Sequence, residues 1–136
     1  MQFDTKIAVV LRDDLAAWQK ANVTAFLVSG IAGTVPGLVG EPYRDASGQE
    51  YLPMFVQPVL VYQAHAPALR RAYERALGRN VSMAIYTSDL FETGHDEANR
   101  AAVAEVPGDE LDLVGIAFRA ERKAVDKVVD GLRFHA

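Results

Sequence analysis

The stretch from Lys6 to Gly33 constrains the fold more than any other part of the sequence. It begins with the unbroken apolar run Ile7–Leu11, IAVVL, which is rich in β-branched residues. A strand that is apolar at every position is buried on both faces, as in a parallel sheet covered by helices. A charged turn and one long helix, expected over residues 15–32, follow this run. The opening therefore predicts a strand, a tight turn and a helix that covers the sheet.

Two apolar stripes run along the expected helix. One holds Leu15, Val23, Leu27 and Ile31, and a second beside it holds Trp18, Phe26 and Gly30. Ser29 is the only polar residue in the second half of the helix, so little of that half is suited to water. We expect the sheet to cover one side and either the next segment or a second copy of the chain to cover the other. This pattern predicts a homodimer.

Further apolar runs alternate with helical patterns. Strands are expected at residues 58–62, 81–87 and 111–118, and helices end near Gly78, Glu105 and Leu132. This order predicts a three-layer α/β/α fold with a mixed, mainly parallel, four-stranded sheet, the fourth strand antiparallel at an edge. Gly115 inside that strand hints at a close approach of another backbone.

The chain of 136 residues is expected to form one α/β domain, residues 1–136. Residues 34–57 are predicted to be a loop and hairpin insertion, with Tyr43 and Tyr51 flanking the turn-rich connection DASG. No apolar run is long enough to span a bilayer, and MQFDTK does not have the order of a signal peptide, so we expect a cytoplasmic protein.

The composition argues against several classes of site. Cysteine is absent, which removes thiol nucleophiles and thiolate metal sites. The formal net charge of −4 argues against tRNA or another nucleic acid as a partner. The strand-to-helix turn has no Gly-rich phosphate loop, and the histidines lack the spacing of metal ligands. We therefore expect no cofactor and no metal.

Polar side chains follow the predicted parallel strands. Their carboxyl ends meet at one edge of a sheet, where ligands bind in such folds. One of the aspartates in the first turn, Asp13 or Asp14, is expected to cap the helix while the other pairs with Arg12. His95 beside Asp96 could support acid–base chemistry, although a histidine in such a loop is also a common capping residue. The outer face of the helix that ends at Gly78 forms an arginine face, which is either an anion-binding or RNA-facing surface or a solvated one. Its arginines are Arg70, Arg71, Arg75 and Arg79.

Two segments resemble a known family. The turn Arg12-Asp13-Asp14-Leu15 resembles the Arg-x-Asp-Leu opening of archaeal/eukaryotic-type peptidyl-tRNA hydrolases. Glu92-Thr93-Gly94-His95-Asp96 lies where that family has Asp-Ala-Gly-x-Thr. Over its full length the chain looks more like a family of small bacterial proteins of unknown function that share this fold. The resemblance implies the peptidyl-tRNA hydrolase II fold over most of the chain, the segment 33–54 excepted.

The resemblance also implies positions for the hydrolase machinery. The catalytic lysine of the family would fall near Asn22, with Lys20 two positions away. Glu92 would stand for the family's acidic residue and Asp96 for its threonine. Without the lysine at its position, the resemblance implies a shared fold more than a shared activity.

Three hypotheses follow. The first is a protein that binds a small polar ligand at the strand carboxyl edge, through Arg12, Asp14, Lys20, Asn22, His65, Thr87 and Thr93. The second is a hydrolase of peptidyl-tRNA or a related ester, with Glu92, Asp96 and His95 as catalytic residues, which requires the arginine face to lie beside the site. The third is a protein-interaction module that uses the hairpin at 43–51.

Overall fold

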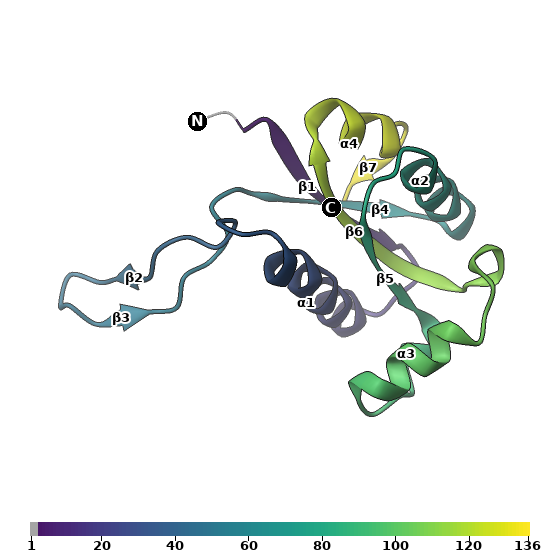
Figure 1. Cartoon of the computed structure of the whole chain (residues 1–136), viewed down its shortest axis with the longest axis horizontal. Helices are drawn as coiled ribbons and strands as arrows, with labels where there is room; N and C mark the ends of the chain where they lie inside the picture. Colours follow the sequence, from purple (N-terminus) through teal and green to yellow (C-terminus); the bar gives the residue numbers. More distant parts are fainter. Residues whose placement is uncertain (1–2) are drawn as a thin grey trace.

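The computed structural model describes residues 3–136 and shows a five-stranded sheet between helical layers (Figure 1). The sheet strands are β1 (Thr5–Arg12), β4 (Val59–Ala64), β5 (Met83–Thr87), β6 (Leu113–Glu121) and β7 (Arg133–Phe134). A separate hairpin is formed by β2 (Tyr43–Arg44) and β3 (Glu50–Tyr51). The helices are α1 (Ala17–Thr34), α2 (Ala66–Gly78), α3 (Asp96–Ala104) and α4 (Arg122–Val128), with 3-10 turns η1 (Ser88–Phe91) and η2 (Gly108–Glu110).

Strand β1 is the centre of the sheet, whose order is β5-β6-β1-β4-β7. The side chains of Ile7, Val9 and Leu11 pack in the core that α1 covers. Those of Ala8 and Val10 pack in the core formed with α2 and α4 on the other face. All five are buried, so the predicted burial of this strand on both faces is confirmed. The chain has the two cores and three layers that an α/β/α fold requires.

The predicted sheet was wrong in strand number and in its main direction. Only β1 and β4 pair in parallel, and the other three pairings are antiparallel. The backbone N–H of Ser88 donates to the carbonyl of Asp112 (3.0 Å), so the connection that leaves β5 at Ser88 returns at Asp112 to the same end of the sheet. Strand β6 must therefore run back antiparallel. It lies between β1 and β5 and not at an edge as predicted.

The fifth strand, β7, was not predicted. It is only two residues long and pairs with Tyr62 and Gln63 of β4. The Phe134 ring stacks on the Tyr62 ring with centroids 4.7 Å apart. Two residues cannot show a period of two in the sequence, so nothing in the pattern marks this strand. The positive φ of Gly131 (85°) precedes it and separates it from α4.

Helix α1 lies close against β6 at Gly115. A Cβ atom at this position would stand 2.8 Å from Cγ1 of Val23 and 3.1 Å from Cδ1 of Leu27. The first distance is shorter than a Cβ atom tolerates and the second is tight, so any larger residue here would force the Val23 side chain or the helix to shift. The atoms nearest to Gly115 belong to side chains of α1 and β1, so the close approach predicted here is made by side chains and not by another backbone.

The turn between β1 and α1 differs from the expected one. Asp14 pairs with Arg12 as expected, but neither aspartate caps the helix. The backbone N–H of Asp13 donates to the carbonyl of Ala64 (2.9 Å), which extends the end of β1. The helix consequently begins later, with Ala16 at its N-cap and only the Gln19 side chain accepting the Ala16 N–H (2.9 Å).

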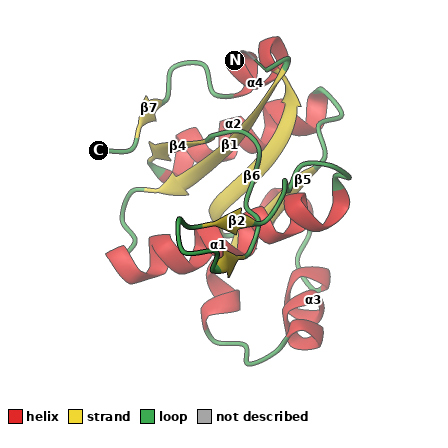
Figure 2. Ribbon diagram, turned by 90° about the vertical axis from the view of Figure 1, so that its left-hand side faces the viewer, coloured by secondary structure: helices red, strands yellow, loops and turns green. Residues whose placement is uncertain are grey.

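Residues 39–56 form an arm that projects from the sheet and helices in Figure 1 and points toward the viewer in Figure 2. Tyr43 and Tyr51 face each other in its hairpin, as the turn-rich connection predicted. Asp45 closes the turn by accepting the backbone N–H groups of Ser47 (2.9 Å) and Gln49 (3.0 Å). Large apolar side chains on the arm are exposed, among them Val39, Tyr43, Tyr51, Leu52, Met54 and Val56.

Candidate functional site

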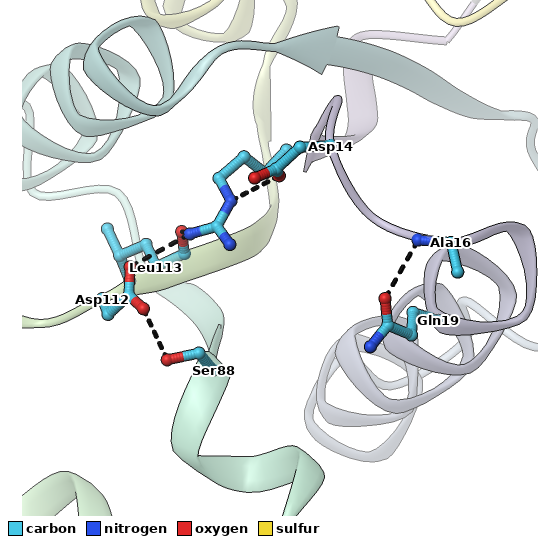
Figure 3. A network of polar contacts seen from close by, with 7 residues as sticks. Asp14, Ala16, Gln19, Ser88, Asp112 and Leu113 are labelled. Carbon is cyan, nitrogen blue, oxygen red and sulfur yellow. Dashed lines mark hydrogen bonds and ion pairs between the residues drawn. The ribbon is translucent and has the colours of Figure 1, made fainter.

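The carboxyl ends of β1 and β5 are joined by a network of ions and hydrogen bonds (Figure 3). The Arg12 guanidinium donates to Asp14 (2.6 Å) and to Asp112 (3.0 Å). Asp112 also accepts the hydroxyl of Ser88 (2.5 Å). Partial burial acts to lower the pKa of Arg12, but the hydrogen bonds and charges of the two aspartates outweigh it and raise that pKa. These polar groups satisfy one another's hydrogen-bonding capacity, so the network serves to link the ends of the two strands.

His65 belongs to a separate pocket of about 250 Å³ beside β4 and β7, which Asp13, Gln63 and Arg133 also line. Its Nδ1 accepts the backbone N–H of Ala68 (3.1 Å) and so caps α2. The predicted edge residues are therefore divided between different places and do not form one site.

A second pocket, here called the aromatic cleft, lies between α1 and the segment from η1 to α3. It encloses about 340 Å³. Trp18, Asn22 and Phe26 form its wall on α1, because residues four apart share one face of a helix. The remaining lining residues are Tyr86, Leu90, Phe91, Thr93, Gly94, His95, Asp96 and Asn99. The cleft thus brings together four predicted site residues: Asn22, Thr93, His95 and Asp96.

The aromatic rings of the cleft form a continuous series. Ring centroids are 6.1 Å apart for Trp18 and Phe91, and 5.2 Å apart for Phe91 and Tyr86. Phe26 follows at 5.9 Å from Tyr86. Tyr86 is buried, whereas Trp18 is 65% exposed and Phe26 is 54% exposed. One of our expectations was that the next segment of the chain covers the second stripe of α1. Within the described chain no segment covers Trp18 and Phe26, which line an open cleft instead.

Tyr86 supplies the polar group at the base of the cleft. Its hydroxyl lies 3.4 Å from the carbonyl of Leu90, to which it donates. Burial raises the pKa of Tyr86, and a hydrogen bond with Asn22 partly opposes that rise. The phenol is therefore neutral at physiological pH and acts as a hydrogen-bonding group.

Thr93 and Asn99 form a polar pair on the opposite wall. The Thr93 hydroxyl contacts the side-chain oxygen of Asn99 and lies 3.1 Å from the carbonyl of Leu90. This pair connects the loop before α3 to the first turns of that helix.

His95 is the N-cap of α3, the capping role considered for it above. Its Nδ1 accepts the backbone N–H of Ala98 (3.2 Å), so the neutral ring carries its proton on Nε2. Nε2–H is then a donor, and general-base chemistry at that atom would require the other tautomer and loss of the cap. Asp96 pairs with Arg100 one turn along the helix. Both residues are placed for binding more readily than for proton abstraction.

Three further predicted site residues also lie outside the cleft. The Nζ atom of Lys20 is 3.1 Å from Nε2 of His135. Glu92 is exposed at the end of η1 and does not line the cleft. Thr87 is 1% exposed, and its hydroxyl has no hydrogen-bond partner among the described residues.

Helix α2, which carries the arginine face, lies on the other side of the sheet from α1 (Figure 1). Arg75 donates to the carbonyl of Asp130 (3.0 Å), and Arg70 donates to those of Gly108 (2.9 Å) and Leu111, so both hold neighbouring segments. The condition set for the hydrolase hypothesis, an arginine face beside the site, is not met. Within residues 3–136 no cluster of three acidic or histidine side chains is placed to hold a metal, and no helix has the length and apolarity to cross a membrane.

Sequence reasoning missed the aromatic residues of the cleft as a binding feature. It placed Trp18 and Phe26 in a stripe to be covered, and it gave Phe91 and Asn99 no role. The available signal was the spacing of four residues from Trp18 through Asn22 to Phe26, which puts an amide between two rings on one helix face.

The comparisons with known proteins give similarity without an activity. Residues 5–136 match the family described as Protein of unknown function (DUF2000). A solved structure of a protein of unknown function from Agrobacterium tumefaciens strain C58 is 49% identical and superposes with a TM-score of 0.97, covering 99% of this chain and 100% of that one. No curated protein matches. The predicted relationship to a family of unknown function is confirmed.

Proposed function

The chain belongs to the DUF2000 family of proteins of unknown function, and we propose that it binds a small, partly apolar molecule in the aromatic cleft. The observation that carries this proposal is the exposure of Trp18 and Phe26 on either side of Asn22, in a cleft based on buried Tyr86. A folded protein gains little by leaving two large rings on one helix face in water unless something covers them.

The dimensions and lining of the cleft support a small ligand. Its volume of about 340 Å³ is within the range of small-molecule sites, roughly 300–1,000 Å³. Such sites combine apolar walls with a few polar groups that fix orientation. Here the amides of Asn22 and Asn99 and the Nε2–H of His95 supply those groups.

The single tryptophan of the chain gives a direct test, because Trp18 lies in the wall of the cleft. We expect its fluorescence to change on titration with a panel of neutral, cationic and anionic compounds that fit the cleft. Asn22→Ala should weaken binding of any compound found by at least about fivefold, the loss of one hydrogen bond. Phe134→Leu, an exposed aromatic outside the cleft, should leave the affinity unchanged. A flat fluorescence response to every compound would refute the proposal.

The hydrolase hypothesis has weaker support from the same cleft. Asn22 and Asp96 line it, but Glu92 does not, and no lining residue is a lysine or arginine. A substrate with a phosphate backbone needs clustered cations, which this wall does not offer. Release of peptide from peptidyl-tRNA at low salt, compared between the wild type and Glu92→Ala, tests it. Turnover that depends on Glu92 would support the hydrolase hypothesis.

The arm supports a second candidate function. We propose that residues 39–56 dock a second copy of the chain, in line with the homodimer expected from the sequence. The hypothesis of an interaction module gains support from the exposure of this arm, because Leu52 and Met54 are 84% and 59% exposed. Exposed apolar side chains on a projecting segment are typical of protein interfaces.

A further inference from the structure

The aromatic cleft has the composition of a site for a positively charged organic group. Four of its lining residues are aromatic: Trp18, Phe26, Tyr86 and Phe91. The face of each ring carries partial negative charge and attracts ammonium groups, tryptophan most strongly. Aromatic clusters of this kind are how proteins recognise quaternary ammonium ligands.

The charges of the cleft favour the same ligand class. The only acidic side chain in its lining is that of Asp96, and none of its lining residues is a lysine or arginine. The side-chain oxygens of Asn22 and Asn99 add acceptors. The formal net charge of −4 attracts cations to the molecule as a whole.

Arg100 does not exclude a cation from this site. It pairs with Asp96 across one helical turn, and both side chains are more than two-thirds exposed. Exposed pairs with this spacing contribute only a few tenths of a kcal/mol. The Asp96 carboxylate has a second oxygen, so it can lie beside the charge of a bound ammonium group while it keeps its pair with Arg100.

The N-terminus of α3, which faces the cleft, would by itself favour an anion. His95 already caps it, and Asp96 and Glu97 in its first turn supply negative charge to its dipole. An anionic ligand would therefore meet a helix end that is already neutralised. The two carboxylates of that turn attract a cation instead.

Resting on the function proposed above, we propose that the ligand of the aromatic cleft is a small organic cation, an alkylated ammonium compound held by the rings of Trp18 and Phe26 and by the Asp96 carboxylate. The rings would surround its methyl groups, and Asp96 would balance its charge.

Choline and its neutral isostere 3,3-dimethylbutan-1-ol separate charge from shape, because they differ only in the central nitrogen or carbon. Both compounds are titrated against the whole chain by Trp18 fluorescence. We expect choline to bind about tenfold more tightly, which is the effect of a cation beside aromatic rings. Its affinity should fall about fivefold in Asp96→Asn and in Phe26→Leu, and stay unchanged in Phe134→Leu.

Each other outcome has a distinct meaning. Equal affinity for both compounds overturns the cation proposal but supports a cleft that binds small molecules. Binding of an anionic probe, benzoate, with no binding of choline also overturns it and leaves the cleft as a site. If none of the three compounds changes the Trp18 fluorescence, the cation proposal is overturned. If no compound of the full neutral, cationic and anionic panel changes it, the proposed function is overturned as well.

Discussion

Thr87 carries a buried hydroxyl that has no partner among the described residues. An unpaired buried polar group lowers stability, so Thr87→Val should raise the free energy of unfolding by about 1 kcal/mol. The matched control is Thr93→Val, which removes a hydroxyl bonded to Leu90 and should lower it by a similar amount. Urea denaturation measures both. A loss of stability in Thr87→Val would mean that the hydroxyl forms a hydrogen bond in solution. Thr87 would then again be a candidate ligand-binding residue.

Gly115 makes a second prediction at this scale. Gly115→Ala places a Cβ atom 2.8 Å from Val23 in a packed core, so α1 must shift away from the sheet. We expect the free energy of unfolding to fall by about 1–3 kcal/mol, the usual cost of overpacking. Gly33→Ala adds a methyl group to the same helix with no atom within 4 Å and should be neutral or stabilising by up to about 1 kcal/mol. Equal effects of the two substitutions would contradict the close approach.

At the scale of elements, the sequence predicts what local pattern controls. The apolar run at Ile7–Leu11 and the helix that ends at Gly78 are visible because burial sets their composition over many residues. Only part of the aromatic cleft could be predicted from the sequence. The residues 93–96 were selected as polar loop positions, but their partners Trp18 and Phe26 looked like core residues, because hydrophobic periodicity does not show whether a covering segment exists.

The hairpin of the arm should depend on pH in a defined way. The hydrogen bond from Tyr51 to Asp45 (2.8 Å) lowers the pKa of Asp45, and backbone N–H groups add to this. The same bond raises the pKa of Tyr51. For Asp45, the stabilisation is present above the ordinary carboxyl pKa and is lost as pH falls through the lowered one. For Tyr51, it is present below the ordinary phenol pKa and is lost as pH rises through the raised one.

The hairpin is therefore expected to be most stable between roughly pH 4 and pH 10. NMR titration of the Asp45 carboxyl measures the effect, and in Tyr51→Phe its pKa should move up toward the ordinary value. Tyr43→Phe, which keeps the Asp45 bond, serves as the control. An identical Asp45 titration in the wild type and in Tyr51→Phe would show that the bond does not form in solution.

At the scale of the whole molecule, strand order could not be predicted from the sequence, because it is set by contacts between distant segments. The direction of β6 follows from the position of one connection, which starts at Ser88 and ends beside it at Asp112. The insertion of β6 between β1 and β5 separates the polar residues that end those two strands, so Arg12 and Ser88 are joined only through Asp112. His65 follows β4, the parallel neighbour of β1, but lines a separate pocket with Asp13.

The homodimer is the remaining prediction at this scale, and two surfaces compete for its interface. If the arm is the interface, the double variant Leu52→Ser, Met54→Ser should convert a dimer at micromolar concentration into a monomer. Its melting temperature in the monomeric state should change little, because both side chains are exposed. If the outer face of α1 is the interface, as the helix pattern first suggested, Ala25→Glu on that exposed face should abolish the dimer instead.

Sedimentation velocity of the wild type and both variants distinguishes these surfaces, with Leu77→Ser on the exposed side of α2 as the control that should keep the dimer. Loss of the dimer in the arm variant alone would assign residues 39–56 to the interface and leave the aromatic cleft to the ligand. A monomeric wild type would refute both surfaces, and the projecting apolar arm would then need a different protein to cover it.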